Sequence, residues 1–436
     1  MTEIKIVIGA NYGDEGKGLM TDYFCHNAMQ KTNKCLVVCS NGGAQRGHTV
    51  ETPEGIRHVF HHFGSGTLVG ADTYLSEKFI LNPMIFREEY LELEKLGFTP
   101  KVYVNGNCII TTPYDMILNQ YIEDKRGEDR HGSCGCGIWE TIVRNSPAMN
   151  DDITTRLKLF EVFELINIAK ETQTTSDNMC FIKSVLLRIK NKYIYQRLNS
   201  EIFWEGMKQN EIIDELKKSQ WWEVIDSSCL LENYISDLEF MLSKIEVAEN
   251  NILKNYEQIV FENGQGLLLD KDIKDGNINT TPSNTGIKNP MEIIQSVWTD
   301  NELKSFVRIE ACYVTRTYVT RHGAGNLEYE RKKEDIDPYM NDITNHPNPY
   351  QGKLRYAKIH PYELDTRIIN DFNLFKFYKS KNILKLITVV THANETNGKY
   401  CTPSNMYVPI IETYVSDGKT RNSIMTNREF RKKWGV

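Results

Sequence analysis

Short apolar runs alternate with amphipathic segments along roughly the first 110 residues and again after residue 255. The apolar runs predict buried strands, and the apolar spacing around Ile85–Leu96 predicts a helix. The strand-like runs are Ile4–Ile8, Cys35–Cys39, Val102–Val104, Ile259–Phe261, Val307–Ile309, Tyr313–Thr315 and Leu384–Val390. This alternation predicts an α/β fold with a mostly parallel central sheet flanked by helices.

Residues 140–255 have a different pattern, because apolar side chains recur at steps of three and four. Ile, Leu, Lys, Glu and Asn dominate this range, and Pro147 is its one proline. The range is therefore predicted to be a mainly helical insertion within one domain that spans residues 1–436. The stretch 323–353 is rich in Gly, Pro, Asn and charges, which predicts a long mobile loop of the kind that serves as a lid.

Composition narrows the class of protein. The net charge is −6 and no Lys/Arg tract dominates, so the electrostatic footprint of a nucleic-acid partner is absent. No window approaches about 18 uninterrupted apolar residues and the N-terminus has no signal-peptide pattern, which disfavours a membrane protein and an exported one. The ten cysteines follow no disulfide-framework spacing, so reduced thiols in a cytoplasmic protein are expected.

The segment Gly13-Asp14-Glu15-Gly16-Lys17-Gly18 lies between the first predicted strand and a helix start. Gly16 and Gly18 allow backbone N–H groups to approach an anion, and Lys17 adds a positive charge, which together predict a P-loop-like phosphate site. The turn is shorter than a Walker A loop. Asp14 could ligate Mg²⁺ or accept a proton from a substrate. A tight surface turn is the alternative interpretation.

Other glycine-rich loops follow later strands. In Asn41–Thr49, His48 could protonate a phosphoryl oxygen, although a turn-capping histidine is the alternative. In Glu262–Asp270, the Gln265 amide could orient a carbonyl or phosphoryl oxygen. The remaining loops of this type are Gly132–Gly137 and Thr280–Gly286; the second could equally be a helix N-cap.

Taken together, these loops resemble the adenylosuccinate synthetase family. The family's Trp-Gly-Asp-Glu-Gly-Lys-Gly, Asn-Ala-Gly-His-Thr, Glu-Gly-Ala-Gln-Gly, Ser-Ser-Asn-Thr and Thr-Arg-Val-Gly-Ala-Gly segments correspond to Tyr12–Gly18, Gln45–Thr49, Glu262–Gly266, Pro282–Thr285 and Thr320–Gly325. The matches follow the family's order, so the resemblance covers the chain, least securely in the helical insertion. Some departures resemble the phage branch, which makes 2-aminoadenylosuccinate from dGMP.

The resemblance implies a ligase that uses a nucleoside triphosphate to phosphorylate O6 of IMP or dIMP, after which the amine of L-aspartate displaces the phosphate. Asp14 would take the N1 proton, His48 would donate to the transferring phosphoryl group, Lys17 would neutralise its charge, and Gln265 would hold the base edge. Mg²⁺ would be bound by Asp14 and the Gly47 carbonyl.

The resemblance also implies further contacts. The residues expected to bind nucleotide are Gly13, Glu15, Gly16, Gly18, Gly47, Thr49, Ser133, Cys134, Arg144, Thr281, Asn394, Ser416 and Gly418. Arg144 is expected to reach the IMP phosphate in a neighbouring subunit, which implies a homodimer. Gly352, Lys353 and Arg355 lie in the counterpart of the aspartate loop and would hold the two carboxylates of L-aspartate. Arg46 and Arg321 are interpreted as ligand contacts because they lie in glycine loops.

Asn394 stands where the family carries the aspartate that recognises guanine. An amide offers one acceptor and one donor and suits adenine better, so ATP or dATP is expected to serve at least as well as GTP. The phage branch generally lacks the loop aspartate, because the 2-amino group of dGMP needs its space. Since Asp14 is present, IMP or dIMP ranks first and dGMP second. A catalytically idle nucleotide sensor on the same fold is the third hypothesis.

Overall fold

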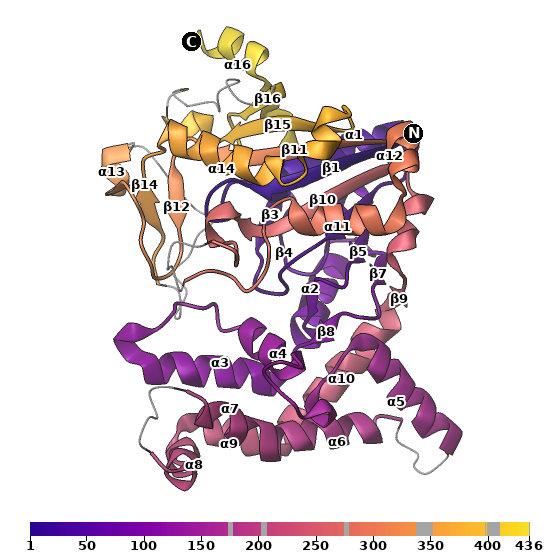
Figure 1. Cartoon of the computed structure of the whole chain (residues 1–436), viewed down its shortest axis with the longest axis vertical. Coiled ribbons are helices and arrows are strands. Elements are labelled where there is room, and N and C mark those ends of the chain that lie inside the picture. The colour runs from indigo at the N-terminus through magenta and orange to yellow at the C-terminus, as the bar shows by residue number, and fades with distance from the viewer. Residues whose placement is uncertain are drawn as a thin grey trace.

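The computed structural model describes residues 1–172, 178–201, 207–273, 279–336, 352–396, 398 and 410–435. Its centre is a ten-stranded sheet in the order β17-β16-β15-β11-β1-β10-β2-β5-β7-β9 (Figure 1). The strands are β1 (Thr2–Gly9), β2 (Leu36–Cys39), β5 (Asp72–Leu75), β7 (Val102–Val104), β9 (Ile245–Val247), β10 (Gln258–Gly266), β11 (Val307–Arg316), β15 (Leu384–Thr391), β16 (Ile410–Ser416) and β17 (Ile424–Thr426). All neighbouring pairs are parallel except β16 and β17.

Helices cover both faces of this sheet. On one face, Met20 and Phe24 of α1 (Lys17–Thr32) pack against buried valines of the central strands. On the other, Ile294 of α11 (Lys288–Val297) and Ile368 of α14 (Pro361–Asn373) join the cluster around Ile4. Burying one such side chain contributes roughly 1.5–3 kcal/mol. The predicted α/β fold with a mostly parallel sheet flanked by helices is confirmed.

The predicted strands were mostly placed correctly, with one difference. Val307–Ile309 and Tyr313–Thr315 belong to the single strand β11, because the residues between them are also buried and continue the ladder with β1 and β15. The helix predicted at Ile85–Leu96 is α2 (Pro83–Lys95), whose start is capped by the side chain of Asn82.

A helical layer lies below the sheet in the view of Figure 1. Its helices are α3 (Pro113–Arg126), α4 (Ile138–Asn145), α5 (Leu159–Thr172), α6 (Cys180–Arg188), α7 (Ile194–Asn199), α8 (Gln209–Lys218), α9 (Gln220–Asp226) and α10 (Ser228–Lys244). Buried side chains of this layer form one apolar cluster with α2. Helices fill most of the described part of 140–255, while the division of the chain into a domain and an insertion stays a prediction. Within the described ranges, no helix has the length and apolarity needed to cross a bilayer.

Smaller elements complete the described chain. They are the pairs β3 (His48–Glu51) with β4 (Arg57–Phe60) and β6 (Ile80–Leu81) with β8 (Ile109–Ile110), the sheet of β12 (Val319–Arg321), β14 (Arg355–Ala357) and β13 (Glu330–Arg331), and the helices α12 (Asp300–Phe306), α13 (Lys333–Ile336), α15 (Lys376–Ser380) and α16 (Asn427–Trp434). The predicted mobile loop at 323–353 contains β13 and α13, and its residues 337–351 lie outside the described residues.

The carboxyl ends of the central strands meet at one edge of the sheet. In the registers of β1, Gly9 pairs with Gly266 of β10 and with Val314 of β11, and Arg316 of β11 pairs with Thr391 of β15. In parallel α/β sheets, ligands bind in the crevice outside such strand ends. The loops that carry the predicted site residues therefore start side by side.

Candidate active site

The first glycine loop is braced from within by two buried charged side chains. Oε1 of Glu15 accepts the backbone N–H groups of Asn11, at 3.0 Å, and Gly13, at 2.8 Å. The Lys17 amine donates to the Gly13 carbonyl at 2.5 Å and lies 3.4 Å from Glu15, and its side chain is fully buried. Both side chains therefore hold the loop in shape. The sequence predicted instead that the Lys17 amine would contact a phosphoryl group.

Glycines allow this loop to pack closely on its neighbours. Gly13 has a φ of 119°, and a Cβ there would lie 2.9 Å from the Cα of Gln265. A Cβ on Gly18 would lie 3.0 Å from the Thr49 carbonyl. These two glycines therefore bring the loop against the turns that carry Gln265 and His48, so their contribution to the site is close packing.

His48 is held by a buried carboxylate. Its Nδ1 lies 2.9 Å from Oε1 of Glu262, and Oε2 of Glu262 accepts the N–H of Ser65 at 3.1 Å. Burial lowers the pKa of His48 to about 4, so the imidazole is neutral at pH 7. Burial also raises the pKa of Glu262, but the facing His48 and Arg46 side chains outweigh it and hold that pKa at about 2. The ionised carboxylate favours the tautomer with its proton on Nδ1, leaving Nε2 as an acceptor.

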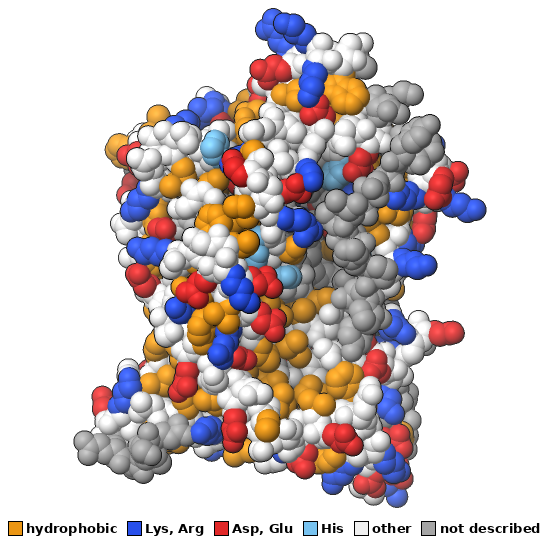
Figure 2. Space-filling model, turned by 180° about the vertical axis from the view of Figure 1, so that it is seen from behind, with side chains coloured by type: hydrophobic (Ala, Val, Ile, Leu, Met, Phe, Trp, Pro, Cys, Tyr) orange, Lys and Arg blue, Asp and Glu red, His pale blue; other side chains and the backbone are white. Residues whose placement is uncertain are grey.

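A cavity of about 620 Å³ brings four predicted residues together: Asp14, Gly47, His48 and Gln265. Its wall also contains the predicted nucleotide-binding residues Gly13, Ser133, Cys134 and Thr281. This volume lies within the range that small-molecule sites occupy. Pale blue histidines are visible near the hollow at the middle of the face in Figure 2.

Gln265 shows the strain expected of a functional turn. It is a non-glycine residue with a φ of 56°, and its buried Oε1 has no hydrogen-bond partner within the described residues. Left-handed backbone in a large side chain costs energy and persists where the surroundings enforce it. Because an unsatisfied buried amide is also costly, the Gln265 side chain is suited to meet a ligand.

Two residues near the predicted loops were missed by the sequence analysis. Nε2 of His322 lies 3.7 Å from Oδ2 of Asp14, and both side chains line the cavity. The buried Glu123 carboxylate accepts the N–H groups of His131, Gly132 and Ser133 at 3.2, 2.8 and 3.2 Å. The position of His322 beside Arg321 was a usable signal, whereas nothing in the sequence marked Glu123, on helix α3, as the residue that orders the Gly132–Gly137 loop.

Arg144 corrects one prediction. Its guanidinium is fully buried and meets Asp115 through two hydrogen bonds of 2.8 Å. Further donors bond to the carbonyls of Thr155, at 2.8 Å, and Ile110, at 2.7 Å. These bonds fix α4 against α3 and the β8 strand, so Arg144 cannot reach into a neighbouring subunit without abandoning a buried ion pair.

Arg46 and Arg321 are also committed to the fold, contrary to their interpretation as ligand contacts. Arg46 donates to the carbonyls of His61, at 2.8 Å, and Phe63, at 3.2 Å. Arg321 donates to the carbonyl of Asn326 at 2.6 Å, and its guanidinium lies 4.6 Å from the ring centroid of Tyr12. Both line the cavity, and most of their N–H groups hold neighbouring loops, although the buried Nε of Arg321 has no hydrogen-bond partner within the described residues.

The remaining predicted residues do not line this cavity. Asn394 is exposed, and Ser416 is buried with its hydroxyl donating to the Gly418 carbonyl at 2.8 Å. Lys353 and Gly352 are exposed, and Arg355 pairs with Glu330. Glu15, Gly16, Lys17, Gly18 and Thr49 support the cavity without lining it. The predicted triphosphate and L-aspartate contacts therefore remain predictions.

The cavity wall has donors that fit Mg²⁺. The described residues contain no group of three or more His, Cys, Asp or Glu side chains placed to hold a metal ion. Mg²⁺ is usually held by one or two carboxylates together with substrate phosphates, and it needs no all-protein cage. Asp14 and Gly47 lie on the same wall, so the donor set fits a magnesium ion shared with a phosphate ligand.

Comparison with known proteins gives one family. The family model described as adenylosuccinate synthetase matches residues 6–348. Adenylosuccinate synthetase of Microcystis aeruginosa is 27% identical over 272 residues, 61% of this chain and 51% of the relative. That of Picrophilus torridus is 28% identical over 336 residues, 76% of this chain and 66% of the relative. In these alignments the chain spans about half to two thirds of the length of the curated relatives it matches.

Two solved structures share the fold along almost the whole chain. Fully ligated adenylosuccinate synthetase from Plasmodium falciparum has a TM-score of 0.60 at 15% identity, covering 97% of this chain and 99% of the other. Cyanophage S-2L succinoaminodeoxyadenylate synthetase (PurZ), bound to dGMP and dATP as an energy donor, has a TM-score of 0.56 at 12% identity, covering 100% and 99%.

Proposed function

Since the chain belongs to the adenylosuccinate synthetase family, we propose that it is a ligase that joins L-aspartate to position 6 of a purine nucleoside monophosphate. The observation that carries this proposal is the meeting of Asp14, His48 and Gln265 on one cavity. A base, a proton-carrying imidazole and an amide are the groups that activation of a purine oxygen needs.

In the proposed reaction, Asp14 takes the N1 proton of the base, which shifts negative charge onto O6. That oxygen attacks the γ-phosphoryl group of a triphosphate, and the diphosphate leaves. The amine of L-aspartate then attacks C6, loses a proton and expels inorganic phosphate. Gln265 holds the base edge so that O6 faces the incoming phosphoryl group, which is a positioning effect.

The contact with Glu262 suits His48 to become charged only when a phosphate group is bound. Without a ligand, burial keeps the imidazole neutral. A phosphoryl anion beside Nε2 would favour the imidazolium, because opposite charges within about 4–6 Å raise the pKa of a histidine. The ionised Glu262 behind the ring would stabilise the same charge. The proton is then available where negative charge develops.

We propose that Asp14 and Gly47 hold Mg²⁺ together with phosphate oxygens of the ligands. The ion would neutralise part of the phosphate charge during transfer. The proposal of a homodimer rests on the family resemblance alone, since Arg144 is committed within its own chain.

We propose IMP or dIMP as the purine substrate and ATP or dATP as the preferred triphosphate. Retention of Asp14 in the cavity supports a base without a 2-amino group, and the amide of Asn394 supports adenine over guanine. A second candidate is the reaction on dGMP, which the fold similarity to the cyanophage synthetase supports.

The test is phosphate release by the purified protein with Mg²⁺ and L-aspartate. IMP, dIMP and dGMP are supplied separately with ATP or GTP, and the products are identified by mass. Release that requires both L-aspartate and IMP or dIMP, with ATP preferred, is the expected result. Turnover with dGMP alone would favour the second candidate. Tight nucleotide binding without turnover on any base would favour an idle nucleotide sensor and overturn the ligase proposal.

A further inference from the structure

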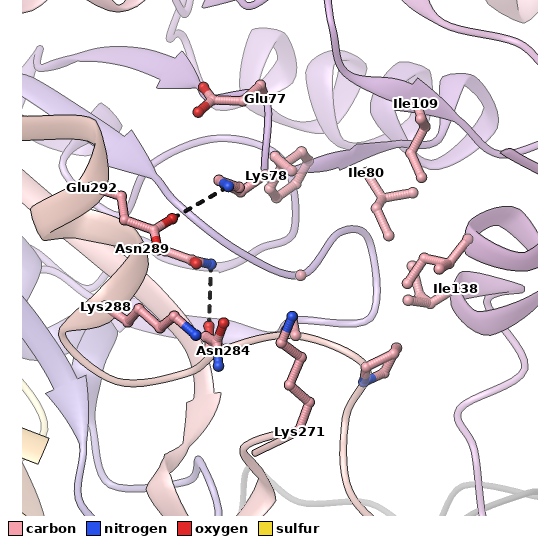
Figure 3. A pocket seen from close by; sticks show the side chains of 15 residues that line it. Glu77, Lys78, Ile80, Ile109, Ile138, Lys271, Asn284, Lys288, Asn289 and Glu292 are labelled. Carbon is pink, nitrogen blue, oxygen red and sulfur yellow. Dashed lines mark hydrogen bonds and ion pairs between the residues drawn. The ribbon is translucent and has the colours of Figure 1, made fainter. Parts of the chain in front are cut away.

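A second cavity of about 370 Å³ adjoins the one that contains Asp14 (Figure 3). One wall is apolar and includes Ile80, Ile109 and Ile138, and the other carries lysine, asparagine and glutamate side chains. The two cavities share Ile138, Lys271 and Pro282 in their walls. Lys271 therefore stands where they meet, and Figure 3 shows its side chain among those that line the second cavity.

The cations in the wall of the larger cavity are Arg46, Arg126, Lys271 and Arg321. As described above, Arg46 and Arg321 donate to carbonyl groups of the fold. Arg126 pairs with Glu123 at 3.1 Å and with Glu201 at 2.9 Å. Among these four cations, Lys271 alone has no hydrogen bond or ion pair from its charged group to another described residue.

The acidic neighbours of Lys271 are used by other groups. The Asp270 carboxylate accepts the N–H of Thr285 at 2.6 Å. The Asp272 carboxylate accepts the Asn284 amide at 2.7 Å and pairs with Lys288 at 3.1 Å. The Asn284 and Lys288 side chains, and more weakly Lys271, lower the pKa of Asp272, while the exposed Lys271 side chain makes no hydrogen bond or ion pair with either adjacent carboxylate among the described residues.

Backbone hydrogen bonds place Lys271 next to a hydroxyl-bearing segment. The N–H of Lys271 donates to the Ser283 carbonyl at 3.2 Å, and the N–H of Thr281 donates to the Leu269 carbonyl at 2.8 Å. Thr280 and Thr281 line the larger cavity together with Lys271. A lysine and two hydroxyl-bearing residues in one wall supply donor groups that suit a phosphate group.

We propose that Lys271 binds the phosphate of the purine monophosphate and so selects nucleotides over nucleosides. This inference rests on the proposed function, because it takes the monophosphate as the ligand of the larger cavity. A phosphate dianion removed from water needs a positive partner, and Lys271 is the one of these four cations whose charged group makes no hydrogen bond or ion pair with another described residue. Arg144, the cation that the sequence offered for this task, is buried in its ion pair with Asp115.

The first test compares Lys271→Met with the wild-type enzyme in steady-state turnover. The KM for the monophosphate is expected to rise about 10- to 100-fold, as for loss of one charge-assisted contact, while kcat changes less than about twofold. Lys271→Arg, which keeps the charge, is expected to stay within about fivefold of wild type. Lys288→Met is the matched control, because that lysine pairs with Asp272 and does not line the larger cavity. An unchanged KM in Lys271→Met would overturn the inference.

The second test measures binding by calorimetry, so that it does not depend on turnover. IMP and the nucleoside inosine are titrated into wild type and Lys271→Met. Weaker binding of IMP with unchanged binding of inosine is the expected result. Equal weakening of both ligands would overturn the inference and indicate a general distortion of the cavity. Binding of IMP that depends on Lys271 in an enzyme that releases no phosphate would support the inference while refuting the proposed ligase. Absence of binding of IMP, dIMP and dGMP to wild type would refute both.

Discussion

The residues predicted for the purine and those predicted for its two reaction partners are organised differently. Asp14 lies in the loop after β1, His48 begins β3 and Gln265 lies near the end of β10, and the three residues line one cavity. Asn394, Ser416 and Lys353 lie toward β14, β15 and β16, and the same cavity does not include them. The purine half of the site is therefore formed by loops after the central strands β1 and β10 together with the β3–β4 pair, whereas the other half lacks a common cavity within the described residues.

The difference has a physical origin in burial. Loops that follow central strands are fixed by ladders on both sides of each strand, and the first glycine loop gains further support from the buried Glu15 and Lys17. Asn394 follows β15, which also has a ladder on each side, and Lys353 precedes β14 in a separate three-stranded sheet, but both residues are exposed. Such positions depend more on a bound ligand for their final geometry.

The largest effect is expected for Asp14→Asn. The amide cannot take a proton from the base, so kcat should fall by about 10³-fold, within the range for loss of a general base. Binding of the monophosphate should change much less, because the substitution keeps the size of the side chain. The measurements are single-turnover phosphate release and calorimetric titration with IMP. Asp151→Asn, an exposed site away from the cavity, is the matched control. Near-normal turnover by Asp14→Asn would assign the proton transfer to another group.

The second prediction tests whether Arg144 stabilises the fold or contacts a ligand. Arg144→Leu leaves Asp115 buried without its partner, so the free energy of unfolding should fall by about 3–5 kcal/mol. The double variant Arg144→Leu with Asp115→Leu should recover much of this loss. Arg87→Leu, which breaks the more exposed pair with Asp237, should cost about 1 kcal/mol or less. Denaturant unfolding measures all three. An unchanged free energy of unfolding in Arg144→Leu, together with a raised KM for IMP, would indicate that Arg144 contacts the phosphate of IMP.

Asp14 and Arg144 also show what the sequence can and cannot predict. The apolar runs predicted the parallel sheet, and the glycine loops indicated Asp14, His48 and Gln265, because strand ends and glycines leave local signals. The ion pair of Arg144 was not predicted, since its partner Asp115 lies on another helix and their contact depends on how the two helices pack. His322 and Lys271 were missed for a related reason: only the fold brings them to the cavity that the motif residues line.

The third prediction concerns the protonation of His48. Burial lowers its pKa from 6.5 to about 4, so the folded protein binds fewer protons than the unfolded chain between these values. The contribution of His48 to stability is therefore complete above pH 6.5 and is lost as the pH falls through about 4. An NMR titration of the imidazole should show a midpoint near 4 in the free protein and a higher one with phosphate ligands. A midpoint near 6.5 without ligand would contradict the buried neutral state.

His48→Gln should lower kcat by about 10²-fold with little effect on the unfolding free energy at pH 7, since the glutamine amide can still face Glu262. His360→Gln is the matched control, because His360 is exposed and lies outside the cavity. Equal activities of the two variants would remove His48 from the proposed reaction.

The smallest effect is expected where the site is least formed, at Asn394. If its amide selects adenine, Asn394→Asp should shift the ratio of kcat/KM for ATP over GTP toward GTP by about tenfold, because a carboxylate accepts two N–H donors and repels the N1 acceptor of adenine. Asn301→Asp, exposed on α12, controls for the added charge. A shift confined to the triphosphate, with the KM for IMP unchanged, would show that Asn394 acts in the triphosphate half alone. An unchanged ratio would mean that the triphosphate base is recognised elsewhere and that position 394 is an exposed surface residue.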